Sequence, residues 1–294
     1  MTVGVCVKNA EDIINLALSS IAKQSYPHDS MELVVVDDGS TDNTFRILND
    51  FASKTDIKTR VYESGGKGLA FSRQMVIDNS KGDYVVWVDA DHELLEDSIR
   101  KHMEFMEDNP NVAAACGNEI FRGETLVATL ESMSIAVKNR ISSTAVDVGG
   151  GVFSLNALRK VGGFDTRLRG AGEDVEVVQR MMKTGMKVYR DQAEFYHNHR
   201  RTWKALWDEY FWWGYGMHYV AHKHKKLRFP ATRIPLLAFL RGLNYSAEVY
   251  VFYRHKKAFL LPFQYFFKNL SFCLGYLSSH LKHHEYMEAR AYNR

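Results

Sequence analysis

The sequence has few cysteines, and their spacing excludes several classes of small stabilised domain. Only three occur in 294 residues, Cys6, Cys116 and Cys273, and no two of them form a CxxC pair. A disulfide framework and a zinc knuckle both need more closely grouped cysteines, so neither is expected. The pattern is typical of a protein in a reducing compartment.

Two common phosphate-binding patterns are also missing. No GxGxxG follows the first apolar run, VGVCV at 3–7, and no GxxxxGK[ST] occurs anywhere in the chain. These absences disfavour a dinucleotide oxidoreductase and a P-loop NTPase. Internal repeats and low-complexity segments are absent too, and because the N-terminus begins directly with a strand-like run, no leader peptide is expected.

Charged and aromatic residues are unevenly distributed. Residues 200–294 carry 16 Lys and Arg against 5 Asp and Glu, and they hold 23 of the 37 aromatic residues. Residues 1–199 show the opposite balance, 22 basic against 30 acidic. A basic, aromatic-rich end on an acidic domain favours an anionic partner, either a nucleic acid or a membrane surface.

The first 115 residues alternate between strand-like and helix-like patterns. Alternation of this kind predicts βαβ units and an α/β fold with a mostly parallel sheet flanked by helices. Residues 118–148 show no clear periodicity, and an irregular segment is expected there. The predicted strands cover 3–7, 33–38, 60–64, 84–88 and 112–117, and the clearest predicted helices cover 10–24, 69–79, 96–107 and 172–185.

Acidic residues follow two of the predicted strands. VVVDDGS ends in Asp37 and Asp38, and VVWVDADHE ends in Asp89 and Asp91. Ligands of open parallel sheets bind at the carboxyl ends of the strands, where these acids would meet. Two carboxylates spaced i, i+2 at a strand end can share a divalent cation that bridges phosphates. The alternative is ordinary turn chemistry, with the acids capping the helices that follow.

A second set of candidate residues lies further along the chain. GEDVEVVQR, beginning at Gly172, places Glu173 and Asp174 at a predicted helix start, where acids are favourable in any case but where one could also act as a general base. His197 and His199 follow a predicted strand, and one of them could complete a metal site.

Four segments, in order over about residues 1–216, resemble the family 2 glycosyltransferases, which have the GT-A fold. They are VGVCVKNAEDIINLALSSIAKQSYP, LVVVDDGSTDNT, GGKGLAFSRQMVIDNSKGDYVVWVDADHEL and GGGVFSLNALRKVGGFDTRLRGAGEDVEVVQRMMKTG. The resemblance implies an inverting, metal-dependent transfer of a sugar from a nucleotide-sugar.

The resemblance also implies roles for the donor-side residues. Asp38, with Asp37 beside it, would hydrogen-bond the base of the donor nucleotide. Lys67 and Arg73 would lie near its ribose and diphosphate, together with Asp89.

The remaining roles concern the metal and the acceptor. Asp91, assisted by Asp89, would hold Mn²⁺ or Mg²⁺ on the diphosphate, with His197 or His199 as a third contact. Asp174 would be the general base, with Glu173 supporting it.

Two departures from the family pattern affect these expectations. In the family the opening strand often carries a Pro and a Tyr before the Asn, whereas VCVKN stands here. The resemblance therefore says less about how the base of the donor nucleotide is held. The QxxRW signature of processive synthases is absent, so transfer of a single sugar is favoured over polymerisation.

The C-terminal third is expected to form a separate extension, residues 217–294, on a catalytic domain of residues 1–216. Its most apolar stretch, 258–281, is interrupted by Pro262 and Lys268, which favours helices lying in a membrane interface over a spanning helix. The basic runs HKHKK (222–226) and RHKK (254–257) would contact anionic head groups. A helical cap on the catalytic domain or an oligomer interface is the alternative.

The expected protein is therefore a glycosyltransferase on the cytoplasmic face of a membrane. Its donor would be a nucleotide-sugar, UDP-linked by preference, and its acceptor a membrane-borne, polyprenyl-linked glycan. Transfer to polyprenyl phosphate itself is a second possibility. A nucleic-acid-binding protein is a third, disfavoured because no nucleic-acid module is recognisable and the aromatic residues lie among Leu, Ile and Pro.

Overall fold

The computed structural model describes residues 1–141, 148–168, 170–224 and 231–292. They form two compact units. The first comprises residues 1–122, 138–167 and 173–198, and the second comprises 123–137, 168–172 and 199–294. The chain thus leaves the first unit at Asn198, whereas the sequence places the end of the catalytic domain at 216. The aromatic helix that follows Asn198 packs with the C-terminal helices, and for that reason it belongs to the second unit.

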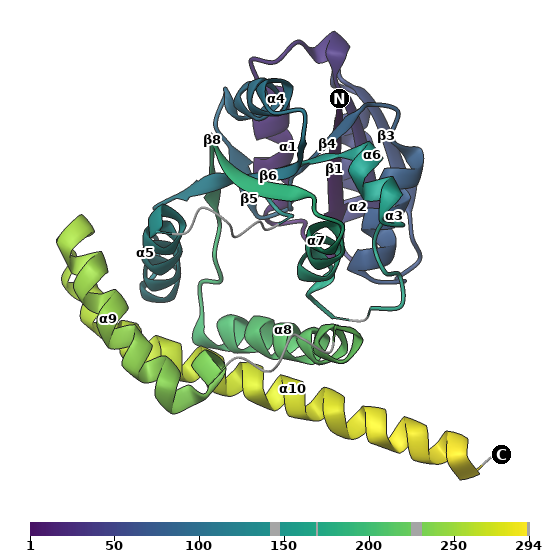
Figure 1. Cartoon of the computed structure of the whole chain (residues 1–294). Helices are drawn as coiled ribbons and strands as arrows, with labels where there is room; N and C mark the ends of the chain where they lie inside the picture. Colours follow the sequence, from purple (N-terminus) through teal and green to yellow (C-terminus); the bar gives the residue numbers. More distant parts are fainter. Residues whose placement is uncertain (142–147, 169, 225–230, 293–294) are drawn as a thin grey trace. The chain divides into compact units, whose positions relative to one another are not determined.

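The first unit is built on an eight-stranded sheet in the order β3-β2-β1-β4-β7-β6-β8-β5 (Figure 1). Strand β1 pairs in parallel with β2 and β4, β2 pairs in parallel with β3, and β6 pairs in parallel with β8. Strand β7 is antiparallel to β4 and β6, and β5 is antiparallel to β8. The prediction of an α/β fold with a mostly parallel sheet is confirmed. The strands are β1 (Thr2–Val7), β2 (Glu32–Asp37), β3 (Lys58–Glu63), β4 (Tyr84–Trp87), β5 (His92–Leu94), β6 (Val112–Ile120), β7 (Gly151–Ser154) and β8 (Lys187–His197).

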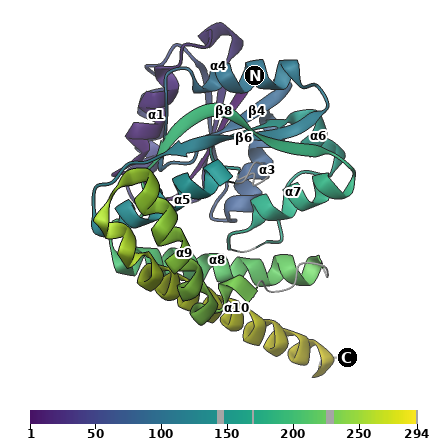
Figure 2. The ribbon, with the colours of Figure 1, turned by 60° about the vertical axis from the view of Figure 1, so that its left-hand side comes forward.

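Helices cover both faces of the sheet (Figure 2). Alternate residues of a strand point to opposite faces, so Val35 packs with α1 and α4 while its neighbours Val34 and Val36 pack with α3, α6 and α7. The two hydrophobic cores fix the sheet between its helices and hold the strand ends in place. The helices of this unit are α1 (Ile14–Ala22), α2 (Thr44–Ala52), α3 (Leu69–Asn79), α4 (Ser98–Asp108), α6 (Leu155–Lys160) and α7 (Glu173–Lys183).

The expectation of an irregular segment over 118–148 is wrong. Strand β6 continues to Ile120, and residues Leu126–Ile141 form helix α5. From Val127 to Ser134 every residue of α5 is buried, including Glu131 and three hydroxyl side chains. A helix buried all round has no polar face, and therefore its sequence lacks the periodicity by which a surface helix is recognised. Residues 142–147 lie outside the described part of the chain.

The second unit is helical. Its long helices are α8 (Trp203–Lys223), α9 (Pro235–Tyr253) and α10 (Leu261–Tyr292), with short 3₁₀ turns at Ala231–Arg233 and Lys256–Leu260. Val127, Leu206, Tyr210 and Phe272 form its core. Beside them the ammonium of Lys268 lies 2.5 Å from a carboxylate oxygen of Glu131, with both side chains buried. Throughout the described residues, none of the helices combines the length and apolarity needed to cross a bilayer.

Candidate active site

The two acids that end β2 are largely engaged in shaping their own loop. Asp37 accepts hydrogen bonds from the backbone of Gly39 (3.1 Å) and Ser40 (2.9 Å) and from the Ser40 hydroxyl (2.5 Å). Asp38 accepts three bonds at one oxygen, Oδ1, from the Ser64 hydroxyl, the Gly68 N–H (2.9 Å) and the Ser72 hydroxyl (3.3 Å). Asp38 therefore joins the end of β2 to the loop between β3 and α3, and its donors all converge on Oδ1.

The β3–α3 loop is rich in glycines that adopt conformations other residues avoid. Gly65, Gly66 and Gly68 all have positive φ, between 69° and 96°. A Cβ added to Gly39 would lie 2.9 Å from the backbone nitrogen of Gly66, so the loops after β2 and β3 touch. Lys67 stands exposed on this loop, with its ammonium 4.6 Å from the centre of the Phe71 ring.

Arg73 is buried between two of the predicted site acids. Its guanidinium lies 2.9 Å from Asp89 at the end of β4 and 3.0 Å from Glu173 at the start of α7. Burial on its own would lower the pKa of Arg73, but the two carboxylates outweigh burial and raise it. Arg73 is 3% exposed, so its position makes it a bridge that holds Asp89 and Glu173.

Asp91 meets two histidines that face each other across β5 and β8. His92 and His197 are register partners of this antiparallel pair, and their rings lie 4.7 Å apart. The Asp91 carboxylate is 3.5 Å from Nε2 of His197 and 3.9 Å from Nε2 of His92. One ligand atom of each of the three residues lies within 4.8 Å of the others, so together they could hold a metal ion.

The environment of this trio shifts the pKa values of the two imidazoles in opposite directions. Burial lowers the pKa of His197, but the carboxylates of Asp91 and Glu119 reverse this and hold it well above its usual range. Burial also lowers the pKa of His92, and the neighbouring His197 adds to that effect. The imidazole of His197 is therefore stabilised as a cation, and that of His92 as a neutral ring.

A glycine leaves room for the trio and for Asp89. A Cβ added at Gly149 would stand 2.3 Å from an Asp89 oxygen and 2.7 Å from a carbon of the His92 ring. Any larger residue at this position would displace both side chains. The GGG that begins at Gly149 thus has a steric reason that the sequence does not reveal.

Asp174 and Glu173 adjoin in sequence but differ in environment. Glu173 is 3% exposed and tied to Arg73. Asp174 is half-buried in the first turn of α7, where its Oδ1 accepts the Val175 N–H at 2.7 Å. A carboxylate at a helix N-terminus is stabilised by the helix dipole.

The structure brings together most of the predicted site residues of the first unit. Asp89 and Glu173 meet at Arg73, and Asp91 meets His197. His199, the other predicted metal contact, is 8% exposed and belongs to the second compact unit. Sequence reasoning missed His92 and Glu119. His92 directly follows DAD, a signal that could have been used, whereas no motif surrounds Glu119.

Family comparisons agree with this fold. The model described as "Glycosyl transferase family 2" matches residues 2–160, and "Glycosyl transferase family group 2" matches residues 84–281. The chain belongs to the family 2 glycosyltransferases; it is a glycosyltransferase with the GT-A fold.

Among curated relatives, the chain is similar to poly-beta-1,6-N-acetyl-D-glucosamine synthase of Staphylococcus epidermidis, 29% identical over 72% of this chain and 53% of that protein. It is also similar to poly(ribitol-phosphate) beta-N-acetylglucosaminyltransferase TarS of Staphylococcus aureus, 31% identical over 34% of this chain and 18% of that protein. The chain therefore spans only part of the length of these relatives.

Two solved structures share the fold. One is the mannosyltransferase PcManGT from Pyrobaculum calidifontis in complex with GDP-Man and Mn²⁺. Its TM-score is 0.67 at 19% identity, and the match covers 95% of this chain and 86% of the PcManGT chain. S. aureus TarS 1–349 in complex with UDP-GlcNAc has a TM-score of 0.54 at 15% identity, covering 96% and 91%.

Proposed function

We propose that this glycosyltransferase uses a divalent metal to transfer a single sugar, with inversion, from a nucleotide-sugar to a membrane-borne, polyprenyl-linked glycan. The observation that carries the proposal is the Asp91–His92–His197 trio. Asp91 follows β4 and lies two residues beyond Asp89, His92 begins β5, and His197 ends β8. In an open α/β sheet this is the edge where ligands bind. The donor would bind here, with its diphosphate on the metal.

The donor nucleotide would lie along the loops that follow β2 and β3. Three donors already converge on Oδ1 of Asp38, so its other oxygen would accept an N–H of the base, with Asp37 holding the loop in shape. Lys67 is exposed on the adjoining glycine-rich loop and would contact the diphosphate. Arg73 would act through the acids that it holds.

The donor set of the trio fits Mn²⁺ better than Mg²⁺. Mg²⁺ favours oxygen ligands alone, whereas the two imidazoles move the preference toward transition-metal ions. Asp91 and His197 would be the principal ligands, with His92 beside them and Asp89 held back by Arg73. When bound, the metal would neutralise charge developing on the leaving diphosphate.

Asp174 would serve as the general base. Its carboxylate would take the proton of the acceptor hydroxyl while that oxygen bonds to the anomeric carbon. The bond from this carbon to the donor phosphate oxygen breaks on the opposite face, and its electron pair leaves with the diphosphate. Glu173 would keep Arg73, and thereby Asp89, in position.

The donor class can be tested on the whole chain by thermal unfolding. The family resemblance makes UDP the first choice and GDP the second, and similar folds have been solved with UDP-GlcNAc and with GDP-Man. A nucleotide at 100 times its Kd stabilises a protein by about 2.7 kcal/mol, which would raise the unfolding midpoint by about 5 °C here. We expect that shift with one nucleotide base and only in the presence of Mn²⁺. A folded protein that shows no shift with any nucleotide, with or without lipid, would contradict the proposal.

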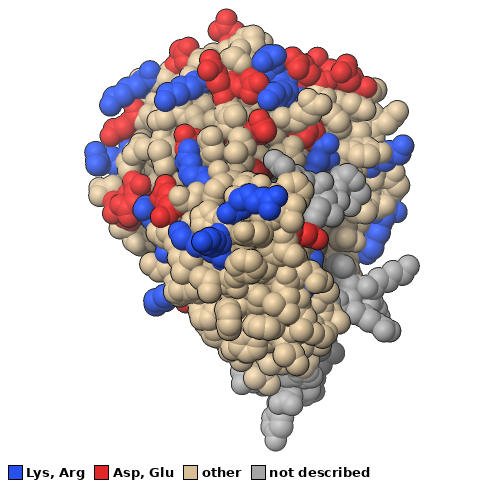
Figure 3. All heavy atoms as spheres, turned by 90° about the vertical axis from the view of Figure 1, so that its left-hand side faces the viewer, with Lys and Arg blue, Asp and Glu red and all other residues tan. Residues whose placement is uncertain are grey.

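An apolar stripe on α10 supports a membrane-borne acceptor. Its residues are spaced by three or four positions, so they share one side of the helix. Five of the six are at least 41% exposed, and a folded monomer seldom leaves so long an apolar surface in water. Figure 3 shows a broad area without Lys, Arg, Asp or Glu in its lower part, and α9 also exposes Leu236, Leu240 and Leu243. The stripe consists of Phe263, Phe266, Leu270, Leu274, Leu277 and Leu281.

Basic residues at one end of α9 would complement the stripe at an anionic surface. The run RHKK begins at Arg254, the C-cap residue that follows α9. Each basic residue near an anionic membrane contributes about 1 kcal/mol. The other basic run, HKHKK at 222–226, lies in part outside the described residues, which stop at 224 before a gap. We propose that this surface rests on the cytoplasmic face of a membrane.

Replacing two stripe residues should release the protein from vesicles. We expect the double variant Phe263→Gln/Leu277→Gln to bind vesicles of phosphatidylcholine and phosphatidylglycerol about tenfold or more weakly in a flotation assay, because it loses two large apolar side chains. Leu16→Gln is the matched control, since Leu16 is 44% exposed on α1 in the other unit. Equal flotation of the double variant, or a wild-type dimer that the variant turns into a monomer, would show that the stripe serves another purpose.

A further inference from the structure

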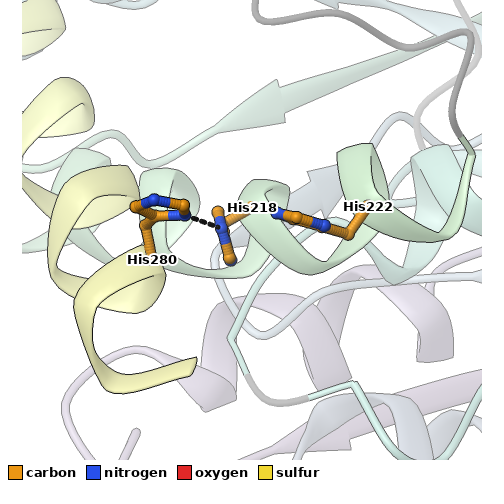
Figure 4. Close-up of side chains that lie close together, drawn as sticks. All are labelled: His218, His222 and His280. Carbon is orange, nitrogen blue, oxygen red and sulfur yellow. Dashed lines mark hydrogen bonds between the residues drawn. The ribbon is translucent and has the colours of Figure 1, made fainter. Parts of the chain in front are cut away.

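Three histidines from two helices lie together in the second unit, apart from the trio at β4. His218 and His222 are one turn apart on α8, and His280 lies on α10 (Figure 4). One ring nitrogen of each is within 4.8 Å of the others. None of them takes part in the proposed transfer.

The crossing of α8 and α10 brings these residues together. A Cβ on Gly214 would meet the Phe272 carbonyl oxygen at 2.0 Å, and one on Gly275 would meet the Phe211 carbonyl oxygen at 2.0 Å. The two backbones therefore touch, which only glycine allows at these positions. One turn beyond Gly214 stands His218, and just over one turn beyond Gly275 stands His280. At this distance from the crossing the two rings meet, with Nε2 of His218 3.1 Å from Nδ1 of His280.

The bonds of His218 orient it as a metal ligand. Its Nδ1 lies 3.2 Å from the Ser279 hydroxyl, and its Nε2 lies 3.1 Å from Nδ1 of His280. The hydrogen bond to Ser279 would fix the ring, as is common around metal-binding histidines, while Nε2 faces Nδ1 of His280, the other nitrogen that would bind the metal. The Tyr276 ring packs edge-on against His218 at 4.9 Å and restricts it further.

We propose that His218, His222 and His280 bind a divalent transition-metal ion, with Zn²⁺ as the best fit. Ligand nitrogens around tetrahedral Zn²⁺ stand about 3.3 Å apart, given Zn–N bonds of 2.0–2.1 Å. His218 and His280 already meet this spacing, and exposed His222 can turn to close it. Water would fill the fourth position. Three imidazoles without a carboxylate suit Zn²⁺ and not Mg²⁺ or Mn²⁺.

The site would join α10 to α8 beyond their glycine crossing. His218 is 3% exposed, so the ion would lie at the edge of the helix packing rather than on loose side chains. Bound metal would thus hold α10, the helix that carries the apolar stripe, against α8 at His280. This inference does not depend on the proposed transfer or on membrane binding.

Metal analysis of the full chain tests the site. Asp91→Asn supplies a background in which the trio at β4 is disabled, and the purification tag should contain no histidine. In that background we expect one equivalent of Zn²⁺ by elemental analysis after dialysis, visible ligand-field absorption on replacing it with Co²⁺, and a rise in the unfolding midpoint of about 5 °C at 100 times Kd. Mn²⁺ should produce none of these effects.

Single substitutions on either helix should remove the ion. His222→Ala, at an exposed position, and His280→Ala on the other helix should each lower the Zn²⁺ content from one equivalent to none and abolish the Co²⁺ absorption. His28→Ala is the matched control, because His28 pairs only with Asp56 in the other unit among the interactions seen in the described residues. Less than half an equivalent in the background protein, or full retention in both variants, would overturn the proposal.

Discussion

Asp174→Asn should lower kcat for sugar transfer by about 10²–10⁴-fold, which is the usual contribution of a general base. Asparagine keeps the size of the side chain and can still accept the Val175 N–H that Asp174 Oδ1 accepts at 2.7 Å. The change therefore removes the proton acceptor with little effect on helix α7. Because the donor would bind elsewhere, the Kd of the nucleotide should stay within about twofold of wild type. Turnover and calorimetric nucleotide binding measure the two effects separately.

Glu173→Gln should behave differently, because the neighbouring carboxylate has a structural partner. Glu173 is buried and forms an ion pair with Arg73, so its loss leaves a buried cation with one compensating acid fewer. We expect a lower unfolding midpoint and weaker donor binding, since Arg73 also holds Asp89. Asp174→Asn should lower the midpoint by no more than about 2 °C, because it loses only the interaction of its charge with the helix dipole.

The control for both variants is Asp50→Asn. Asp50 is exposed on α2, where it pairs only loosely with Arg46 at 3.4 Å, so neither stability nor turnover should change. Near-wild-type turnover in Asp174→Asn would reject Asp174 as the base. A large loss of turnover in Glu173→Gln without any loss of stability would transfer that role to Glu173.

Asp91→Asn should weaken Mn²⁺-dependent nucleotide binding by at least about tenfold, because loss even of an outer-shell partner of a metal ligand costs that much. Asp91 supplies the only carboxylate in the trio with His92 and His197. Without the Asp91 carboxylate the site keeps only the two imidazoles, which suit Mn²⁺ less well than a site that includes a carboxylate. Nucleotide titration with and without Mn²⁺ measures the effect as the difference between the two affinities.

Metal-independent binding of the nucleotide base should survive the same substitution. Asp38 and its loop do not depend on Asp91 for any of their hydrogen bonds. Asp108→Asn, at an exposed position that ends α4, is the matched control and should bind as wild type. Equal Mn²⁺ dependence in Asp91→Asn and wild type would place the metal elsewhere.

Much of the first unit could be predicted because its signals are local. Helix α3 occupies the predicted residues 69–79, β4 begins at Tyr84 as predicted, and β1 begins at Thr2, one residue before its predicted start. Strand β5, three residues long, was not predicted, since a segment that short has no measurable period. It matters all the same, because its pairing with β8 sets His92 opposite His197.

The sequence by itself determined the α/β class, the family resemblance and the candidate acids, because each depends on residues that are close together in the chain. Only the tertiary structure decided how those residues are used. It placed Arg73 between Asp89 and Glu173, an arrangement that the family resemblance did not indicate. It also brought His218 and His222 of α8 close to His280 of α10, where two glycines let the helices touch. Contacts between distant segments depend on how helices and strands pack, and no local pattern records that packing.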